Sequence, residues 1–236
     1  MFRTTFPLIA SLIAPMGLIA PAALAAPVTP IDLDGLALGA FVVGPVGPTV
    51  DSNFETEDGG ALGDFSGGAA CPAGFASCIP PENPADTVYT FVQTVVPGVD
   101  AVPNDAPFVG ADVVDPGVVA SYAIGFAPSG FDGTAGYSFG DAEGPGLSFE
   151  IDEAADGTLT FASVGADWTA GQSVRFFFQT TQPPSGPGGA YILSGDGTGT
   201  AAGPLPAEIA PIPVPAGGLL LLSAFGAMIA WRRRTA

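Results

Sequence analysis

The stretch that decides the fold is Leu147-Ser148-Phe149-Glu150-Ile151-Asp152, which resumes after a short turn as Thr158-Leu159-Thr160-Phe161. Apolar and polar residues alternate in both parts, and this period of two places successive side chains on opposite faces of a β-strand. The sequence 153–157 between the two parts contains acidic residues and a glycine, as turns do. The sequence therefore predicts a β-hairpin at about 146–163, with an apolar face toward a core and a polar face in water.

Further strands are predicted along the same part of the chain. In Val174-Arg175-Phe176-Phe177-Phe178, the alternation directs Phe176 and Phe178 to the core and Arg175 with Phe177 to the other face, which indicates a central strand. The segment 28–85 is rich in glycine, proline and small residues and is interpreted as mainly loops, and no helix is expected between the chain ends. The resulting expectation is an all-β fold, an antiparallel β-sandwich or jelly roll. The additional strands are expected at 87–96, 118–126, 134–139, 173–180 and 190–194.

The N-terminal residues 1–25 have the features of a signal peptide. Arg3 supplies a positive start, an apolar stretch follows, and Ala23 and Ala25 stand at the small positions that a signal peptidase requires. A retained N-terminal anchor helix is the alternative, and the prolines at positions 7, 15 and 21 count against it. The sequence therefore predicts export, with cleavage after Ala25.

The C-terminus combines a proline-punctuated motif, an uncharged segment and a cluster of arginines. The motif is Ile212-Pro213-Val214-Pro215-Ala216, the uncharged segment is 217–231, and the cluster is Arg232, Arg233 and Arg234. Guanidinium groups resist transfer across a bilayer, so the order predicts a motif outside the membrane, a transmembrane helix and a cytoplasmic stop.

This arrangement resembles VPLPA-CTERM, a variant of the PEP-CTERM sorting signal that exosortase-type transpeptidases process in Gram-negative envelopes. Ile212 stands at the family's first valine, Pro213 at its first proline, Val214 at its leucine, and Pro215 with Ala216 at its closing pair. The resemblance implies an exosortase as partner, cleavage near the motif, and transfer of the body to the cell surface or extracellular matrix. It implies nothing about the body's own activity, and an anchor helix that is never cut remains the alternative.

Four parts follow from these patterns: a signal peptide, an exported acidic domain, a proline-rich linker with the sorting motif, and a transmembrane helix with an arginine-rich tail. Within the domain, 182–189 is interpreted as a surface loop. The boundaries are 1–25, 26–203, 204–216 and 217–236.

The part of the chain between the signal peptide and the sorting motif is strongly acidic. It contains all 23 acidic residues and only one of the five basic residues, Arg175, so its formal charge is 1 − 23 = −22. Such a surface repels phosphate backbones and attracts divalent cations and basic partners, which excludes nucleic acid as a partner. The acidity is explained either by solubility outside the cell or by the gathering of Ca²⁺.

Two cysteines, Cys71 and Cys78, are predicted to form a disulfide in the oxidising compartment that the signal peptide implies. A catalytic or metal-binding cysteine pair is the alternative, but the chain has no histidine to act as base or further ligand.

Most catalytic machinery is excluded by composition, because the chain contains no histidine and its five basic residues are all arginine. Ser-His-Asp and Cys-His sites, Schiff-base chemistry and histidine-ligated metals are therefore ruled out. Hydrolysis by two carboxylates is compatible with the composition, and Glu150, Asp152 and Glu153 are its candidates; an exposed acidic hairpin tip explains them better, because nothing nearby in the sequence marks a sugar cleft. The protein is not expected to be an enzyme.

Calcium is the one cofactor for which candidate ligands exist, although no complete loop is present and no cofactor is expected. Two sequences join carboxylates to a tight glycine bend, as calcium loops do, and a third group is denser. The second sequence is equally well explained as a turn between strands. The candidates are Asp32-Leu33-Asp34-Gly35, Ser194-Gly195-Asp196-Gly197, and the group Asp51, Glu55, Glu57 and Asp58.

Five aromatic residues, Phe126, Phe131, Tyr137, Phe139 and Trp168, are candidates for a sugar-stacking surface. Alternation places Phe126 and Phe139 inside the domain and leaves Trp168 as the ring expected to be exposed.

The sequence favours an exported, surface-sorted structural or adhesive protein of the extracellular polysaccharide matrix or envelope. It would be anchored in the membrane by its C-terminus and then transferred to the surface. Its expected partners are an exosortase and extracellular polysaccharide. The alternative is a carbohydrate- or calcium-binding β-sandwich module.

Overall fold

The computed structural model describes residues 25–36, 38–41, 49–72, 88–100 and 113–209. These residues form one curled, mixed sheet of 13 strands with almost no helix, which confirms a β-rich fold. The predicted signal peptide, apart from Ala25, and the predicted transmembrane helix fall on residues outside the described ranges. The strands are β1 (Ala26–Val28), β2 (Ile31–Asp32), β3 (Leu38–Phe41), β4 (Val50–Glu55), β5 (Ala61–Pro72), β6 (Tyr89–Pro97), β7 (Ser121–Ile124), β8 (Phe131–Tyr137), β9 (Phe149–Glu153), β10 (Leu159–Ser163), β11 (Val174–Thr180), β12 (Gly189–Ser194) and β13 (Thr198–Gly203), with the helical turns η1 (Leu33–Gly35) and α1 (Phe139–Glu143).

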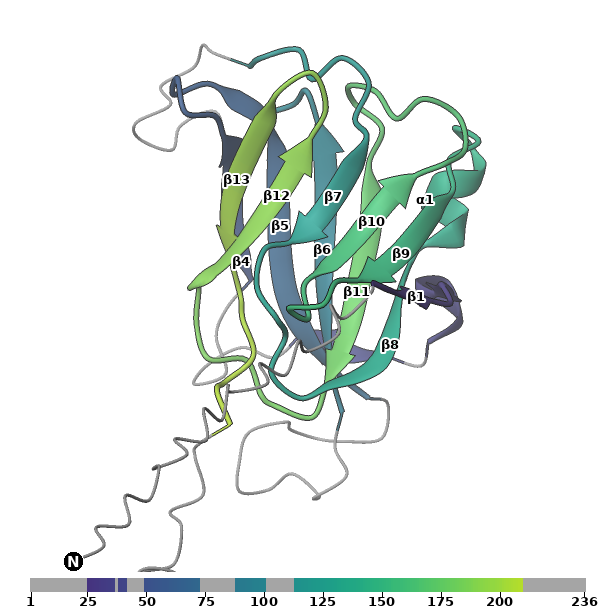
Figure 1. Cartoon of the computed structure of the whole chain (residues 1–236), viewed down its shortest axis with the longest axis vertical. Coiled ribbons are helices and arrows are strands. Elements are labelled where there is room, and N and C mark those ends of the chain that lie inside the picture. The colour runs from purple at the N-terminus through teal and green to yellow at the C-terminus, as the bar shows by residue number, and fades with distance from the viewer. Residues whose placement is uncertain (1–24, 37, 42–48, 73–87, 101–112, 210–236) are drawn as a thin grey trace, which may run out of the picture.

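The strands follow the order β1-β9-β10-β7-β12-β13-β4-β5-β6-β11-β8-β2, and β3 pairs with β5 beside β4. All neighbours are antiparallel except β2 and β8. The sheet curls so that β9, β10, β7 and β12 lie in front of β5, β6, β11 and β8 (Figure 1). Aromatic rings fill the space between these halves: Phe176 of β11 lies 4.7 Å from the ring of Tyr122 and 5.1 Å from that of Phe161, between ring centroids.

The N-terminal segment joins the two ends of this sheet. Ala26 of β1 pairs with Glu153 of β9, and only a few residues later Ile31 of β2 pairs with Gly136 of β8. A side chain at position 136 would collide with this strand, because an added Cβ would lie 1.9 Å from the carbonyl oxygen of Ile31. The absence of a side chain at Gly136 therefore permits the close approach that brings β1 and β2 to the opposite ends of the sheet.

The predicted hairpin is confirmed. β9 and β10 pair in register, with Ile151 opposite Phe161, and Leu159, Phe161, Phe149 and Ile151 are all buried. The turn at 154–158 is closed by Gly157, whose φ of 84° is unfavourable for residues with a Cβ. The strands expected at 87–96, 173–180 and 190–194 correspond to β6, β11 and β12, while those at 118–126 and 134–139 are displaced or shortened to β7 and β8.

The interpretation of 28–85 as mainly loops was wrong for its described part. That part contains β4 and the 12-residue strand β5, whose sequence ALGDFSGGAACP has too few large apolar residues to show a period of two. The expectation of no helix was also wrong, because α1 begins after Ser138, whose hydroxyl accepts a hydrogen bond from the Asp141 amide in an N-cap.

A small second apolar cluster lies on the outer face of the sheet. Phe177 lies on the opposite face of β11 from Phe176 and is fully buried. Val92 of β6 lies beside it and is 6% exposed. Leu33 covers them, with Leu36 and Leu38 half-buried beside it. We call residues 31–36 together with Leu38 the strap. Because the strap covers β11, this central strand is buried on both faces.

The two tracts interpreted as a surface loop and a linker pair with one another. The amide of Ser185 donates to the carbonyl of Leu205 at 2.9 Å, and the amide of Ala207 donates to that of Pro183 at 2.7 Å. Tyr191 donates its hydroxyl to the carbonyl of Pro204. The folded domain therefore continues to Ala207, beyond the boundary expected at 203.

Candidate functional site

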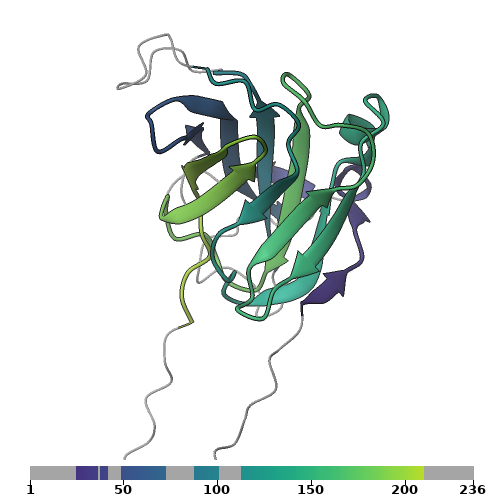
Figure 2. The same ribbon diagram turned by 45° about the horizontal axis from the view of Figure 1, so that its top comes forward.

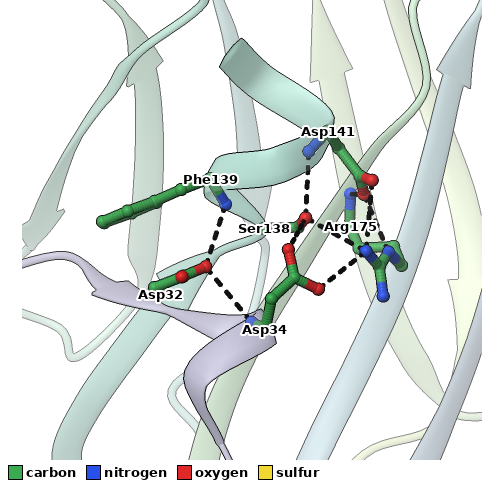
Figure 3. A network of polar contacts seen from close by, with 6 residues as sticks. All are labelled: Asp32, Asp34, Ser138, Phe139, Asp141 and Arg175. Carbon is green, nitrogen blue, oxygen red and sulfur yellow. Dashed lines mark hydrogen bonds and ion pairs between the residues drawn. The ribbon is translucent and has the colours of Figure 1, made fainter. Parts of the chain in front are cut away.

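Arg175 is at the centre of the most extensive polar network in the described part of the chain (Figure 3). Its Nε donates to Asp141 Oδ2 at 2.7 Å, and its Nη2 donates to Asp34 Oδ1 at 2.9 Å. Ser138 accepts from Nη2 and donates its own hydroxyl to Asp34 Oδ2. The network thereby ties the strap and α1 to the central strand β11.

These contacts shift the pKa values of Asp34 and Arg175. The hydroxyl of Ser138 is the main cause that lowers the pKa of Asp34; the Arg175 charge also lowers it, and partial burial opposes both. The hydrogen bond that Arg175 donates to Asp141 raises the pKa of Arg175, and the Coulomb attraction of Asp141 and Asp34 raises it further, against the effect of burial. The side chains of Arg175 and Asp34 are 41% and 40% exposed, so screening by water keeps this pair to about 1 kcal/mol or less.

The carboxylates predicted as calcium ligands at 32–35 are acceptors in this hydrogen-bond network. Asp32 Oδ1 accepts the backbone amides of Asp34 and Phe139, at 3.1 and 3.0 Å, and both oxygens of Asp34 accept protein donors. In the part of the chain that the structure describes, no three acidic or cysteine side chains gather as a metal site requires. The arrangement is explained by structural hydrogen bonding.

The other acidic candidates lie at three separate places in the fold. Ser194-Gly195-Asp196-Gly197 forms the turn between β12 and β13, where the Gly195 amide donates to the Gly197 carbonyl. Glu150 and Asp152 are exposed on β9, and Glu153 ends that strand. Asp51 and Glu55 lie on β4, while Glu57 and Asp58 follow in the turn to β5.

A groove crosses the junction of β4 and β13. Three members of the acidic group predicted from the sequence, Glu55, Glu57 and Asp58, line it, but its hydroxyl-bearing residues from β13 were not predicted. The only paired residues there are Thr200 and Glu55, so the two strands leave hollows of about 490 and 730 Å³ on either side of that pair. Carboxylates and hydroxyls line it together with small and apolar residues such as Gly189, Ala201 and Leu62. The residues that both hollows share are Glu55, Thr56, Glu57 and Thr200.

Two amide side chains near this region are buried. Asn53, which lines the smaller hollow, is 5% exposed and donates from Nδ2 to Asp100 at 3.3 Å, and its Oδ1 has no hydrogen-bond partner among the described residues. Gln93 of β6 is fully buried, and neither polar atom of its amide has a partner in the described ranges. Isolated Asn and Gln residues in a sequence give no signal for either position.

The aromatic prediction was wrong in two places. Trp168 is fully buried, packs against Phe149 and Phe176, and donates Nε1 to the carbonyl of Gln172. Phe139 is 42% exposed instead of buried, because the chain leaves β8 and begins α1 at that residue. Phe126 is half-buried against Tyr191 and Phe178. The five aromatic residues therefore do not form a sugar-stacking surface.

The processing sites predicted from the sequence fall largely outside the described residues. The sorting motif 212–216, Arg232 to Arg234, Ala23 and Cys78 are not among them. Ala25 is the first described residue and is exposed, immediately before β1, and Cys71 lies near the end of β5.

Comparison with known proteins found no family model, no curated protein and no solved structure that matches this chain. Neither helical turn in the described ranges is long and apolar enough to cross a membrane.

Proposed function

We propose that the protein is exported, anchored by its C-terminus, processed at a VPLPA-CTERM-type signal, and displayed as a structural or adhesive component of the cell surface or polysaccharide matrix. The observation that carries this proposal is the order of motif, uncharged segment and arginines at 212–234. The paired segment that ends at Ala207 supports it, because a folded domain then stops shortly before the motif.

The domain is proposed to be a variant of the β-sandwich or jelly roll. Ring contacts between the two halves of the curled sheet, such as those of Phe176, support this description. The surface of this domain is acidic. Of the 23 acidic residues, 19 lie in the described ranges, and only Asp64 among them is buried. A strongly acidic body whose described part contains no cluster of metal-ligating side chains suits a scaffold role, and we assign catalysis to no residue.

The intact mass of the protein at the cell surface tests this proposal. Loss of residues 1–25 and of everything after the motif is expected, and replacement of Pro213 and Pro215 by alanine should leave the C-terminal segment attached. A surface protein that retains Trp231 and the arginines would refute processing, and a full-length cytosolic protein would refute export.

Carbohydrate binding is the second candidate, and the groove at the β4–β13 junction supports it. Its carboxylates and hydroxyls can accept and donate the hydrogen bonds that a polyol needs, and the unpartnered Oδ1 of Asn53 is a further acceptor beside it. Titration calorimetry with fragments of the producer's polysaccharide would show saturable binding that Glu55→Gln weakens; binding unchanged in this variant would exclude the groove. Calcium receives no comparable support, since Asp32 Oδ1 and both carboxylate oxygens of Asp34 already accept protein donors.

A further inference from the structure

The groove at the β4–β13 junction contains carboxylates without a counter-charge. Glu55 and Glu57 line both hollows, Asp58 lines the larger one, and none of the described residues that line the groove is basic or aromatic. Arg175 is bound by Asp141 of α1, and α1 lies on the opposite side of the domain from the β12–β13 hairpin (Figure 2). The negative charge of the groove is therefore not compensated by the protein.

The fold does not use these three carboxylates. Unlike Asp34 and Asp141, which accept hydrogen bonds from Arg175, Glu55, Glu57 and Asp58 have no hydrogen bond or ion pair among the described residues. All three are exposed. Their oxygens are free to accept hydrogen bonds from a ligand.

Asn53 provides an independent sign of a ligand in the smaller hollow, which it lines together with Glu55 and Glu57. It is 5% exposed, and its Nδ2 donates to the carboxylate of Asp100 at 3.3 Å. Because an ionised carboxylate can only accept, this contact fixes the amide and leaves Oδ1 without a donor in the described ranges. Buried acceptors without a donor are rare and unfavourable in folded proteins. A ligand that donates a hydrogen bond to Asn53 would satisfy this atom.

The free polar atoms of the groove therefore call for a ligand rich in donors. Asn53 Oδ1 and the carboxylates of Glu55 and Glu57 only accept hydrogen bonds. A uronic acid or a sulfated sugar would bring further acceptors and a like charge. A neutral sugar would bring hydroxyls, but the groove has no aromatic ring on which it could stack. An ammonium group brings three donors and the opposite charge, and charge-assisted hydrogen bonds are about twice as strong as neutral ones.

The shape of the groove favours a chain with several cationic groups over a single metal ion. A metal ion needs its oxygen ligands around one point, and in the described part of the chain no three acidic side chains gather in this way. The hollows of about 490 and 730 Å³ share four lining residues, so they form one continuous groove, and each has the size of a small-molecule site. The hydroxyls of Thr198 and Thr200 lie along it and suit the hydroxyls of a sugar chain better than the side chains of a peptide.

On the basis of the carbohydrate site proposed above, we infer that the groove binds a polysaccharide with free amino groups, such as a hexosamine polymer that lacks its N-acetyl groups. Ammonium groups of the polymer bind Glu55, Glu57 and Asn53 Oδ1, and its hydroxyls bind Thr200. The same charge repels uronic-acid polymers. The groove thereby selects the cationic polysaccharide from a mixed matrix.

Two tetrasaccharides that differ only in their amino groups test this inference: β-1,4-linked glucosamine and β-1,4-linked N-acetylglucosamine. Titration calorimetry on the full chain in a non-ionic detergent near pH 6 should show saturable binding of the first and about tenfold weaker binding of the second. An increase in salt from 50 to 500 mM should weaken only the first. Equal affinities would overturn the inference and leave the carbohydrate site standing. Absence of binding by both would also overturn it, and fragments of the producer's polysaccharide in the same buffer then decide whether the carbohydrate site stands.

Matched variants show where the glucosamine tetramer binds. Glu55→Gln with Glu57→Gln removes two groove carboxylates, and Glu150→Gln with Asp152→Asn removes two exposed carboxylates from β9, with the same change in net charge. Each exposed ion pair is worth a few-fold in affinity, so the groove pair should weaken binding about tenfold and the β9 pair less than about twofold. Equal effects of the two pairs would refute the groove as the site. Thermal melting confirms that both variants are folded.

Other cationic ligands complete the test. Tetralysine that binds as tightly as the glucosamine tetramer, with the same loss in the groove pair, would indicate a basic peptide as the partner and refute the polysaccharide. Binding of the tetramer that disappears with a calcium chelator would refute direct contact between ammonium groups and carboxylates. Weak tetralysine binding and no effect of the chelator are expected.

Discussion

Replacement of Phe177 by alanine should release the strap without disrupting the main core. Phe177 is fully buried on the outer face of β11, under Leu33 and beside Val92. Truncation of a buried phenylalanine costs about 3–5 kcal/mol. We expect the lower limit here, about 3 kcal/mol, because Leu36 and Leu38 are only half-buried and can move into the space.

Phe176→Ala is the matched control on the same strand. Its ring contacts five other rings in the core, those of Tyr122, Tyr137, Phe149, Phe161 and Trp168, so little collapse is possible and a cost of about 5 kcal/mol is expected. Equilibrium unfolding in guanidinium chloride measures both free energies. Native-state hydrogen exchange of the Leu36 and Leu38 amides, which donate to Leu33 and Leu36 carbonyls, measures release of the strap.

The two variants should therefore differ in pattern as well as in size. Phe177→Ala should accelerate exchange in the strap well beyond the global loss of stability, while Phe176→Ala should accelerate exchange of all protected amides together. If the strap amides of Phe177→Ala remain as protected as in the parent protein, or the loss is below about 1 kcal/mol, the outer cluster does not hold the strap.

Three smaller predictions concern other parts of the fold. The folded-state pKa of Asp34 is lowered, so its contribution is present above the unfolded pKa of about 3.9 and is lost as pH falls through the folded value; Asp34→Asn should cost up to about 1 kcal/mol at pH 7 and nothing near pH 2, and a pH-independent cost in urea titrations would contradict this. Tyr191→Phe removes the hydroxyl that pairs with the buried Pro204 carbonyl, so a loss of about 1–2 kcal/mol is expected, and an unchanged melting temperature would argue against that bond. Gly136→Ala should displace β2 and cost about 1–3 kcal/mol, whereas Gly35→Ala, with no atom near its added Cβ, should not; equal melting temperatures would disprove the close approach.

The strands that could be predicted are those whose large apolar residues alternate, such as β9, β10 and β11. β5 could not be, because its glycines replace the expected apolar side chains. The ring of Phe65, on the same strand, lies across Gly67, where an added Cβ would be 2.7 Å from it. Phe65 and Tyr191 of β12 also cover Gly203 of β13. A period of two in the sequence fails where a few large rings cover the glycines of their own and neighbouring strands.

The Arg175 network illustrates a different limit. Alternation predicted the direction of Arg175, outward and beside Phe177. Its partners could not be predicted, because Asp34 lies 141 residues away and Asp141 lies 34 residues away in the sequence. Arg175 is the single basic residue among 23 acidic ones between the chain ends, so charge alone does not identify which carboxylates pair with it. The curled sheet selects two of them by bringing the strap and the N-terminus of α1 to the same point on β11.

The proline-rich ends of the domain show why composition alone does not identify a spacer. Proline lacks an amide hydrogen, so a proline-rich tract predicts an unpaired, extended chain. Pro184 and Pro206 nevertheless face each other in a bridge, and the hydrogen bonds around them come from the amides of Ser185, Leu205 and Ala207. Proline is compatible with such pairing wherever its neighbours donate the hydrogen bonds. The distance between the domain and the sorting motif is consequently set by the last paired amide, at Ala207, and not by the first proline of the tract.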